Sequence, residues 1–269
     1  MHNPPPYATR NVHYLLGLPF DAVTLDQAVA HIRMATQTRS PCFFSTPNLN
    51  FLIASQTNAA FRQSVVDSDL SLADGMPIVW LAKLLAIPLP GRVAGSDVFE
   101  ALRQTPQGGH KIKVYFFGGP PGVAQRAAEK INAENAGMVC VGYETPGFGS
   151  VEDMSSAATL AKINTSGAEF LVVALGAVKG QAWILHNRAQ LTVPVVSHLG
   201  AVVNFVAGNV QRAPLWMQKT GLEWLWRVKE EPSLWARYFN DGVALCKLMP
   251  SVATMAVKNR FGKRAPILR

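Results

Sequence analysis

The sequence predicts an α/β fold: a Rossmann-like, mostly parallel sheet flanked by helices, followed by a helical C-terminal appendage. Short apolar runs alternate with amphipathic stretches from Tyr14 to about Val206, a pattern typical of strands joined by covering helices. After Gly208 the strand-like runs stop. With 269 residues, of which 49% are hydrophobic and 16% charged, the chain can bury a sizeable core. This composition excludes a disordered tail and a disulfide-stapled miniprotein.

Helix starts can be read between the predicted strands. Thr24 opens a capping box with Gln27 before the amphipathic stretch Ala28–Met34. Ser150 is the expected N-cap of a helix over Ala157–Ile163. Open parallel sheets bind ligands where the strands end and the loops begin. Six apolar runs are the predicted strands, at Cys42–Ser45, Leu70–Ala73, Lys113–Phe117, Met138–Tyr143, Phe170–Leu175 and Val193–Ser197.

The basic residues are concentrated near the C-terminal end. Residues 1–210 hold 14 Lys and Arg against 13 Asp and Glu, whereas residues 211–269 hold 11 against 4. Helices broken at Pro214, Pro232 and Pro250 are expected in the second segment, so we predict a body of residues 1–210 and an appendage of residues 211–269. Four of the six tryptophans also lie in this appendage. Cations mixed with tryptophan suit an anionic membrane surface or a nucleic acid.

The chain shows no targeting or metal-binding pattern. Its first residues do not resemble a secretory signal, and its most apolar windows, Met76–Pro90 and Val243–Val257, fall short of the roughly 18 residues needed to span a bilayer. A cytoplasmic location is therefore expected. Cys42, Cys140 and Cys246 form no CxxC pair, and the six histidines have no paired spacing, so no metal cofactor is predicted.

A glycine-rich turn follows the predicted strand over Lys113–Phe117. Gly118, Gly119 and Gly122 lie between this strand and a helical run over Val123–Asn132, where backbone N–H groups can approach a phosphate. A nucleotide diphosphate site and a plain tight turn explain the pattern equally well. The turn lacks GxGxxG, a Walker lysine and a ribose-binding acid, which argues against a dehydrogenase.

Polar residues follow three other predicted strands. Asp74 is either an ordinary helix N-cap or a carboxylate in the ligand crevice that takes a proton from a hydroxyl. Thr46 and Asn48 can bind sugar hydroxyls or cap the next helix. Arg92, in a loop, can clamp a phosphate or remain a surface arginine. His198, beside another strand end, is expected to be a packed core histidine.

Six sequence blocks together resemble the WecG/TagA/CpsF family, glycosyltransferase family 26. They occur in the family's order and run from about residue 15 to 240, which is most of the chain. The blocks are Thr46-Pro47-Asn48, Ala73-Asp74-Gly75, Arg92-Val93-Ala94-Gly95-Ser96-Asp97, Phe117-Gly118-Gly119-Pro120, Gly208-Asn209-Val210-Gln211-Arg212-Ala213-Pro214 and Gly221-Leu222-Glu223-Trp224-Leu225-Trp226-Arg227.

The resemblance implies a bacterial enzyme of cell-surface polysaccharide synthesis (exopolysaccharide, teichoic-acid-type or common-antigen). Such an enzyme transfers a sugar from a UDP-sugar to a polyprenyl-diphosphate-linked saccharide, inverts the anomeric centre and uses no metal. It implies a cytoplasmic protein held peripherally on the inner leaflet of the plasma membrane. The expected partners are the UDP-sugar, the lipid-linked saccharide and an anionic membrane surface, and not a nucleic acid; a homo-oligomer is compatible with the sequence.

The same resemblance assigns roles to individual residues. Asp74 matches the general base, and the appendage is expected to bring arginines over the active site. The expected nucleotide-binding residues are the three glycines of the turn. The expected substrate-binding residues are Thr46, Asn48, Arg92, Gln181, Arg212, Arg227 and Arg237.

Three stretches of the sequence depart from the family pattern. Where the family has Gly-Ala-Pro-Lys-Gln-Glu, this chain has Gly176-Ala177-Val178-Lys179-Gly180-Gln181. Val178 therefore stands at the proline, Gly180 at the glutamine and Gln181 one place later. Asn204 replaces an acid, and an arginine of the family pattern is either replaced by Leu234 or absent. Altered donor specificity and reduced activity both explain these departures, and the donor and acceptor sugars stay open. The alternative function is a non-catalytic nucleotide- or nucleic-acid-binding module with a basic arm.

Overall fold

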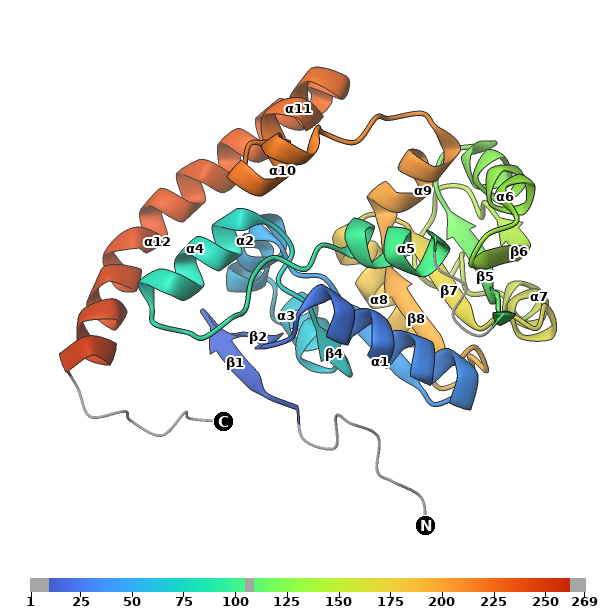
Figure 1. Ribbon diagram of the computed structural model, residues 1–269, viewed down its shortest axis with the longest axis horizontal. Helices are drawn as coiled ribbons and strands as arrows, with labels where there is room; N and C mark the ends of the chain where they lie inside the picture. The colour runs from blue at the N-terminus through green and yellow to red at the C-terminus, as the bar shows by residue number, and fades with distance from the viewer. Residues whose placement is uncertain (1–9, 105–108, 262–269) are drawn as a thin grey trace, which may run out of the picture.

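The computed structural model describes residues 10–104 and 109–261 and is built around one six-stranded parallel sheet (Figure 1). The spatial order of the strands is β4-β3-β8-β7-β5-β6, and every adjacent pair is parallel. This architecture confirms the predicted α/β fold. The strands are β3 (Cys42–Ser45), β4 (Leu70–Ser71), β5 (Ile112–Gly118), β6 (Met138–Glu144), β7 (Phe170–Ala174) and β8 (Val195–His198).

Helices cover both faces of the sheet, because each parallel connection must cross over it. On one face, Phe44, Phe116 and Phe170 of the strands pack with Phe99. On the other face the ring of Phe117 stacks on Trp183, with centroids 4.4 Å apart. The first face is covered by α1 (Leu25–Thr38), α5 (Gly95–Gln104), α6 (Val123–Glu134) and α9 (Gly200–Ala207), and the second by α7 (Ala157–Thr165) and α8 (Ala177–Asn187).

A third apolar cluster lies beside the β4 edge. It includes a hairpin of β1 (Val12–Leu15) and β2 (Leu18–Asp21), which sequence reasoning missed. Leu16 and Gly17 both have positive φ, 49° and 88°, as a two-residue turn matching the strand twist requires. A leucine at such a position gives no turn signal. The helices of this cluster are α2 (Leu49–Thr57), α3 (Ala59–Val66) and α4 (Met76–Leu84).

The helix starts agree with the sequence in one case and differ in another. Thr24 and Gln27 form the expected capping box at α1. The expectation for Ser150 is wrong: α7 is capped by Ser156, whose hydroxyl accepts the Thr159 N–H at 3.1 Å. A cap must directly precede the first helical turn, and Ser150 instead exchanges hydrogen bonds with Asp153 in an exposed turn.

The C-terminal part is helical: α10 (Leu215–Thr220), α11 (Glu223–Glu230), the 3₁₀ turn η2 (Pro232–Leu234) and α12 (Trp235–Phe261). Pro214 and Pro232 begin segments as expected. Pro250 lies inside α12, so the predicted break there is wrong. Val252 and Ala256, on the next turns, are buried in the third cluster, and this packing offsets the hydrogen bond that a helical proline loses.

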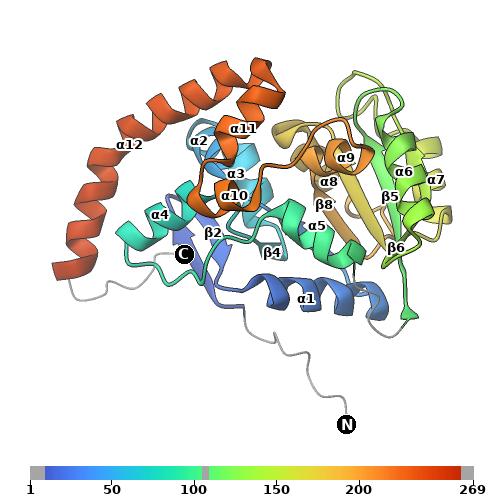
Figure 2. The same ribbon diagram turned by 45° about the horizontal axis from the view of Figure 1, so that its top comes forward.

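The C-terminal helices contact the preceding fold at both ends of α12. The Asn50 Nδ2 group lies 3.1 Å from both carboxylate oxygens of Asp241, and Asn259 donates to the Leu85 carbonyl at 3.0 Å. Figure 2 shows α12 running from α11 to the outer side of α4. Among the described helices, none is long and apolar enough to cross a membrane. The domain boundary near residue 210 stays a prediction.

Candidate active site

A cleft of about 1170 Å³ opens at the carboxyl ends of the strands, between the sheet and the C-terminal helices. Ligands bind at this edge in open α/β sheets. The body and the C-terminal segment both line the cleft. Lining residues from the body include Thr46, Asn48, Asp74, Arg92, Gly119, His198 and Asn204; those from the C-terminal segment include Glu223, Arg227, Leu234, Arg237 and Asp241.

Asp74 lies in the loop between β4 and α4. Its N–H donates to the Pro47 carbonyl at 3.1 Å, and its Oδ2 accepts the Gly95 N–H at 3.4 Å. The N-cap of α4 is Gly75, with φ 99° and no side-chain cap, so Asp74 is not the ordinary N-cap that its position suggested. The carboxylate therefore lines the cleft without capping the helix.

The surroundings of Asp74 increase its affinity for a proton. Burial raises the pKa of this carboxyl to about 7, and the negative charge of Glu223 adds to the effect. The Arg92 guanidinium and the Gly95 N–H oppose it. A carboxylate whose pKa lies near neutrality is suited to accept a proton and to retain it during a reaction.

Thr46 and Asn48 follow β3 and line the same cleft. The Asn48 Oδ1 accepts the Phe51 N–H at 3.2 Å and caps α2, as one of the two interpretations of the sequence proposed. Thr46 is buried beside Gly95, where an added Cβ would lie 3.1 Å from the threonine methyl. Both side chains are therefore held close to Asp74 by neighbouring strand ends.

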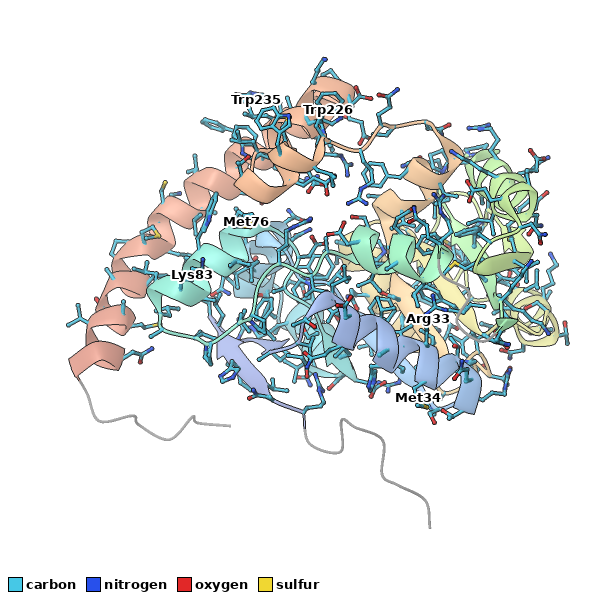
Figure 3. The ribbon with its side chains drawn as sticks, in the orientation of Figure 1. Arg33, Met34, Met76, Lys83, Trp226 and Trp235 are labelled. Atoms are coloured by element: carbon cyan, nitrogen blue, oxygen red, sulfur yellow. The ribbon has the colours of Figure 1, made fainter. Side chains whose placement is uncertain are left out.

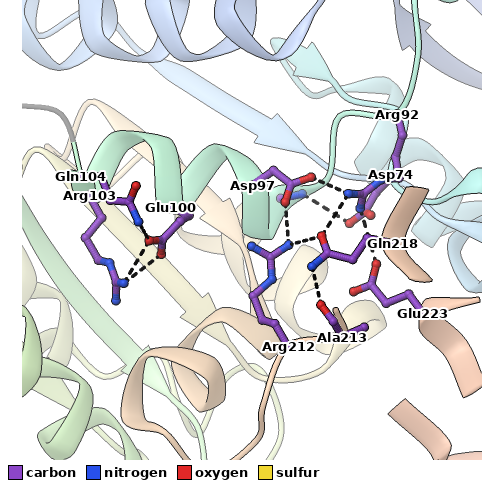
Figure 4. A network of polar contacts seen from close by, with 11 residues as sticks. Asp74, Arg92, Asp97, Glu100, Arg103, Gln104, Arg212, Ala213, Gln218 and Glu223 are labelled. Atoms are coloured by element: carbon purple, nitrogen blue, oxygen red, sulfur yellow. Dashed lines mark hydrogen bonds and ion pairs between the residues drawn. The ribbon is translucent and has the colours of Figure 1, made fainter. Parts of the chain in front are cut away.

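An ion-pair network joins the body to the C-terminal segment (Figure 4). Arg92 Nη2 lies 2.7 Å from Asp97 Oδ2, and its Nη1 lies 3.5 Å from Glu223 Oε2. Arg212 Nη2 lies 2.5 Å from the other Asp97 oxygen and 3.1 Å from Gln218 Oε1. Asp97 thus holds two guanidinium groups, that of the nearby Arg92 and that of Arg212, which lies 115 residues further along the chain than Asp97.

Arg227 and Arg237 contribute further positive charge from α11 and α12. Arg227 pairs with Glu231 at 2.7 Å and lies over the Phe205 ring at 5.2 Å. Arg237 lies over the Tyr238 ring at 5.0 Å and is exposed. Both line the cleft, whereas Arg212 is not among the lining residues and pairs with Asp97.

The remaining residues predicted for the site do not line the cleft, apart from Gly119. Gln181 is buried under β3, where its Nε2 donates to the Ser45 hydroxyl at 3.0 Å. Gly118 has φ 100°, and a Cβ there would lie 2.7 Å from the Ala174 oxygen. Gly122 precedes α6 with φ 75°. The Gly119 N–H already donates to the Ala174 carbonyl at 2.8 Å, so backbone geometry alone explains these glycines.

The comparison with known proteins decides the family. The model of the "Glycosyl transferase WecG/TagA/CpsF family" matches residues 13–260. The chain belongs to this family. It is therefore a glycosyltransferase, and the resemblance seen in the six sequence blocks is confirmed.

Two relatives of this glycosyltransferase come from bacilli. A protein of Bacillus spizizenii is 27% identical over 224 residues, covering 83% of this chain and 82% of the relative. A protein of Bacillus subtilis is 30% identical over 221 residues, covering 82% and 80%. Both are N-acetylglucosaminyldiphosphoundecaprenol N-acetyl-beta-D-mannosaminyltransferases.

The departures from the WecG/TagA/CpsF pattern lie in different places. Asn204 and Leu234 line the cleft, so these two can affect a bound substrate. Val178 is 45% exposed on α8, outside the lining. Gly180 is buried beneath the ring of His198.

Sequence reasoning assigned no role to Glu223, Asp97 or Asp241, although all three are close to the site. Glu223 and Asp97 lie inside blocks that carry the family resemblance, and this was the available signal. Nothing in the sequence pairs Asp241 with Asn50, which is 191 residues away. Within the described residues, no group of three or more His, Cys, Asp and Glu side chains could hold a metal ion.

Proposed function

We propose that this protein is an inverting, metal-independent transferase that moves a sugar from a UDP-sugar to a polyprenyl-diphosphate-linked saccharide. The observation that carries the proposal is the Asp74 carboxylate in a cleft that Arg92, Arg227 and Arg237 also line. The names of the two bacillary relatives, which specify an N-acetylmannosaminyl transfer onto a lipid diphosphate saccharide, support this acceptor class.

The reaction is a single displacement at the anomeric carbon. The acceptor hydroxyl attacks this carbon, and its proton passes to a carboxylate oxygen of Asp74. The bond from the anomeric carbon to the diphosphate oxygen breaks on the opposite side, and its electron pair leaves with UDP. One displacement of this kind inverts the configuration of the sugar.

The departing UDP gains negative charge, which the site must stabilise. Arg92, Arg227 and Arg237 line the cleft and can form charge-assisted hydrogen bonds to diphosphate oxygens. In the structure Arg92 and Arg227 are paired with Glu223 and Glu231. A bound diphosphate has the same sign of charge as these carboxylates and can pair with the same guanidinium groups.

We further propose that the C-terminal helices dock on an anionic membrane surface. Figure 3 shows Trp226 and Trp235 on the side of the molecule opposite to Met34. Large apolar side chains are exposed on α10 to α12, and such groups near basic residues favour interfacial binding. The exposed apolar residues include Leu215, Trp216, Leu225, Trp235, Phe239 and Val243.

The test is turnover of a panel of UDP-sugars with a short-chain polyprenyl-diphosphate N-acetylglucosamine acceptor. In Asp74→Asn we expect kcat to fall by about 10²- to 10⁴-fold, because the proton acceptor is lost. Asp26→Asn, which removes an exposed carboxylate on α1, is the matched control and should keep wild-type activity. Full activity in Asp74→Asn would remove the proposed base.

A further inference from the structure

His198 is the last residue of β8, in the middle of the carboxyl edge of the sheet. Asp74 follows β4 in the chain, and the glycine turn follows β5. Across the sheet, the strands from β4 to β5 lie in the order β4, β3, β8, β7, β5. Adjacent strands are spaced at about 4.8 Å. The ring of His198 therefore lies between the Asp74 side of the cleft and its Gly119 side, and it lines the cleft.

The imidazole is held on three sides. Its ring stacks on Phe51, with centroids 6.4 Å apart and an interplanar angle of 28°. A Cβ on Gly180 would lie 2.4 Å from Nδ1, and a Cβ on Gly200 would lie 3.1 Å from Cε1. Glycine in a helix interior costs about 1 kcal/mol relative to alanine. Gly180 of α8 bears this cost, and the space it leaves is occupied by His198.

The ring is neutral at physiological pH. Burial lowers the pKa of His198 to about 4, and the Val173 carbonyl offsets this only in part. A neutral imidazole has one N–H donor and one lone pair, and a sugar hydroxyl can bond to either. Nδ1 is buried at Gly180 with no hydrogen-bond partner among the described residues, so the contact to a ligand in the cleft is expected from Nε2. With 8% exposure the side chain is a core histidine as expected, but it also has access to the cleft.

We propose that His198 binds the transferred sugar of the donor through a hydrogen bond to one of its hydroxyl or acetamido groups. This inference rests on the proposed function. If the acceptor hydroxyl lies at Asp74 and the nucleotide lies toward Gly119 and Asn204, the transferred sugar lies between them, above β3 and β8. Thr46 and Asn48, which follow β3, and His198, which ends β8, are among the polar residues that line the cleft there.

The test compares the affinity of the full chain for UDP with its affinities for UDP-N-acetylmannosamine, UDP-N-acetylglucosamine and UDP-glucose, measured by calorimetry. His198→Phe keeps a ring against Phe51 and removes both nitrogens. For the UDP-sugar that the wild type binds most tightly, we expect the affinity of His198→Phe to be about fivefold to tenfold lower, which corresponds to the loss of one hydrogen bond. UDP alone should bind as before, and His198→Asn should recover part of the loss.

Two further variants separate a contact from a change of shape. His186→Phe, on the exposed side of α8, should change neither the affinity for UDP nor the affinity for the UDP-sugar. Gly180→Ala should displace the imidazole and reduce UDP-sugar affinity selectively, but should have no further effect when His198 is already alanine.

Equal losses for UDP and UDP-sugar, or no loss at all in His198→Phe, would overturn the inference while leaving the proposed function intact. If the wild-type chain binds neither UDP nor any of the three UDP-sugars, the proposed function fails, and the assignment of His198 fails with it.

Discussion

Asp74 is surrounded by charged side chains from two separate parts of the chain. Glu223 and Asp97 raise its pKa, and Arg92, which pairs with both carboxylates, lowers it. Glu223 belongs to α11, whereas the other two lie in the body. The proton affinity of Asp74 therefore depends on a residue that reaches the site only because the C-terminal helices fold over it.

Glu223→Gln tests this dependence. Removing the negative charge makes ionisation of Asp74 easier, so its pKa should fall from about 7. Because the base acts when ionised, the acidic limb of the kcat/KM profile should move to lower pH. The measurement is a pH profile of sugar transfer, and Glu230→Gln, an exposed position on the same helix, is the control. An unmoved acidic limb in Glu223→Gln would show that Glu223 does not influence the base.

Among the elements, α7 shows that two serines can carry the same N-cap signal although only one of them caps the helix. Ser150 and Ser156 both precede the helix, and both hydroxyls accept a backbone N–H three residues later. Only Ser156 directly precedes the first turn, so only this hydroxyl satisfies an N–H of the helix. At the same helix start, the Thr159 hydroxyl donates a hydrogen bond to Oε1 of Glu144, at the end of β6, at 2.9 Å.

Ser156→Ala should lower the free energy of unfolding by about 1 kcal/mol, the usual value of an N-cap hydroxyl. Ser150→Ala, in an exposed turn, should cost no more than about 0.5 kcal/mol. Urea unfolding of the two variants beside the wild type measures the difference. The opposite ranking would contradict the assignment of the cap.

At the scale of the whole molecule, the cleft is assembled from residues far apart in the chain. The sheet supplies Thr46, Asp74 and His198, and α11 and α12 supply Arg227 and Arg237. The same C-terminal helices carry the exposed apolar side chains of the proposed docking surface. The arginines of the cleft and the proposed docking surface therefore belong to the same set of helices.

Replacing Trp235 and Phe239 together by serine should weaken sedimentation with anionic vesicles by about tenfold or more. Each side chain is more than half exposed, 54% and 59%, and burial of one such ring contributes about 1.5–3 kcal/mol. Met34→Ser, an exposed apolar position on the far side, is the control. Equal binding by the double variant and the wild type would place the membrane contact elsewhere.

Much of the fold was predictable because its signals are local. The apolar runs of the six strands, the Thr24 capping box and the glycine turn each act within a few residues, and the structure has them close to where the sequence indicates. The continuation of α12 through Pro250 was not predictable in this way. Whether a proline ends a helix depends on packing by residues such as Val252, which a local pattern does not contain.

The sequence alone therefore determined the α/β architecture, the family and the strand-end positions from which a site can be built. The tertiary structure decided which candidates share one cleft: it brought Asp74 and Arg227 together, buried Gln181 beneath β3 and placed His198 over Gly180. The physical reason is distance along the chain. Secondary structure follows from neighbours, whereas the charge and space around a buried side chain depend on residues that only the folded chain brings near.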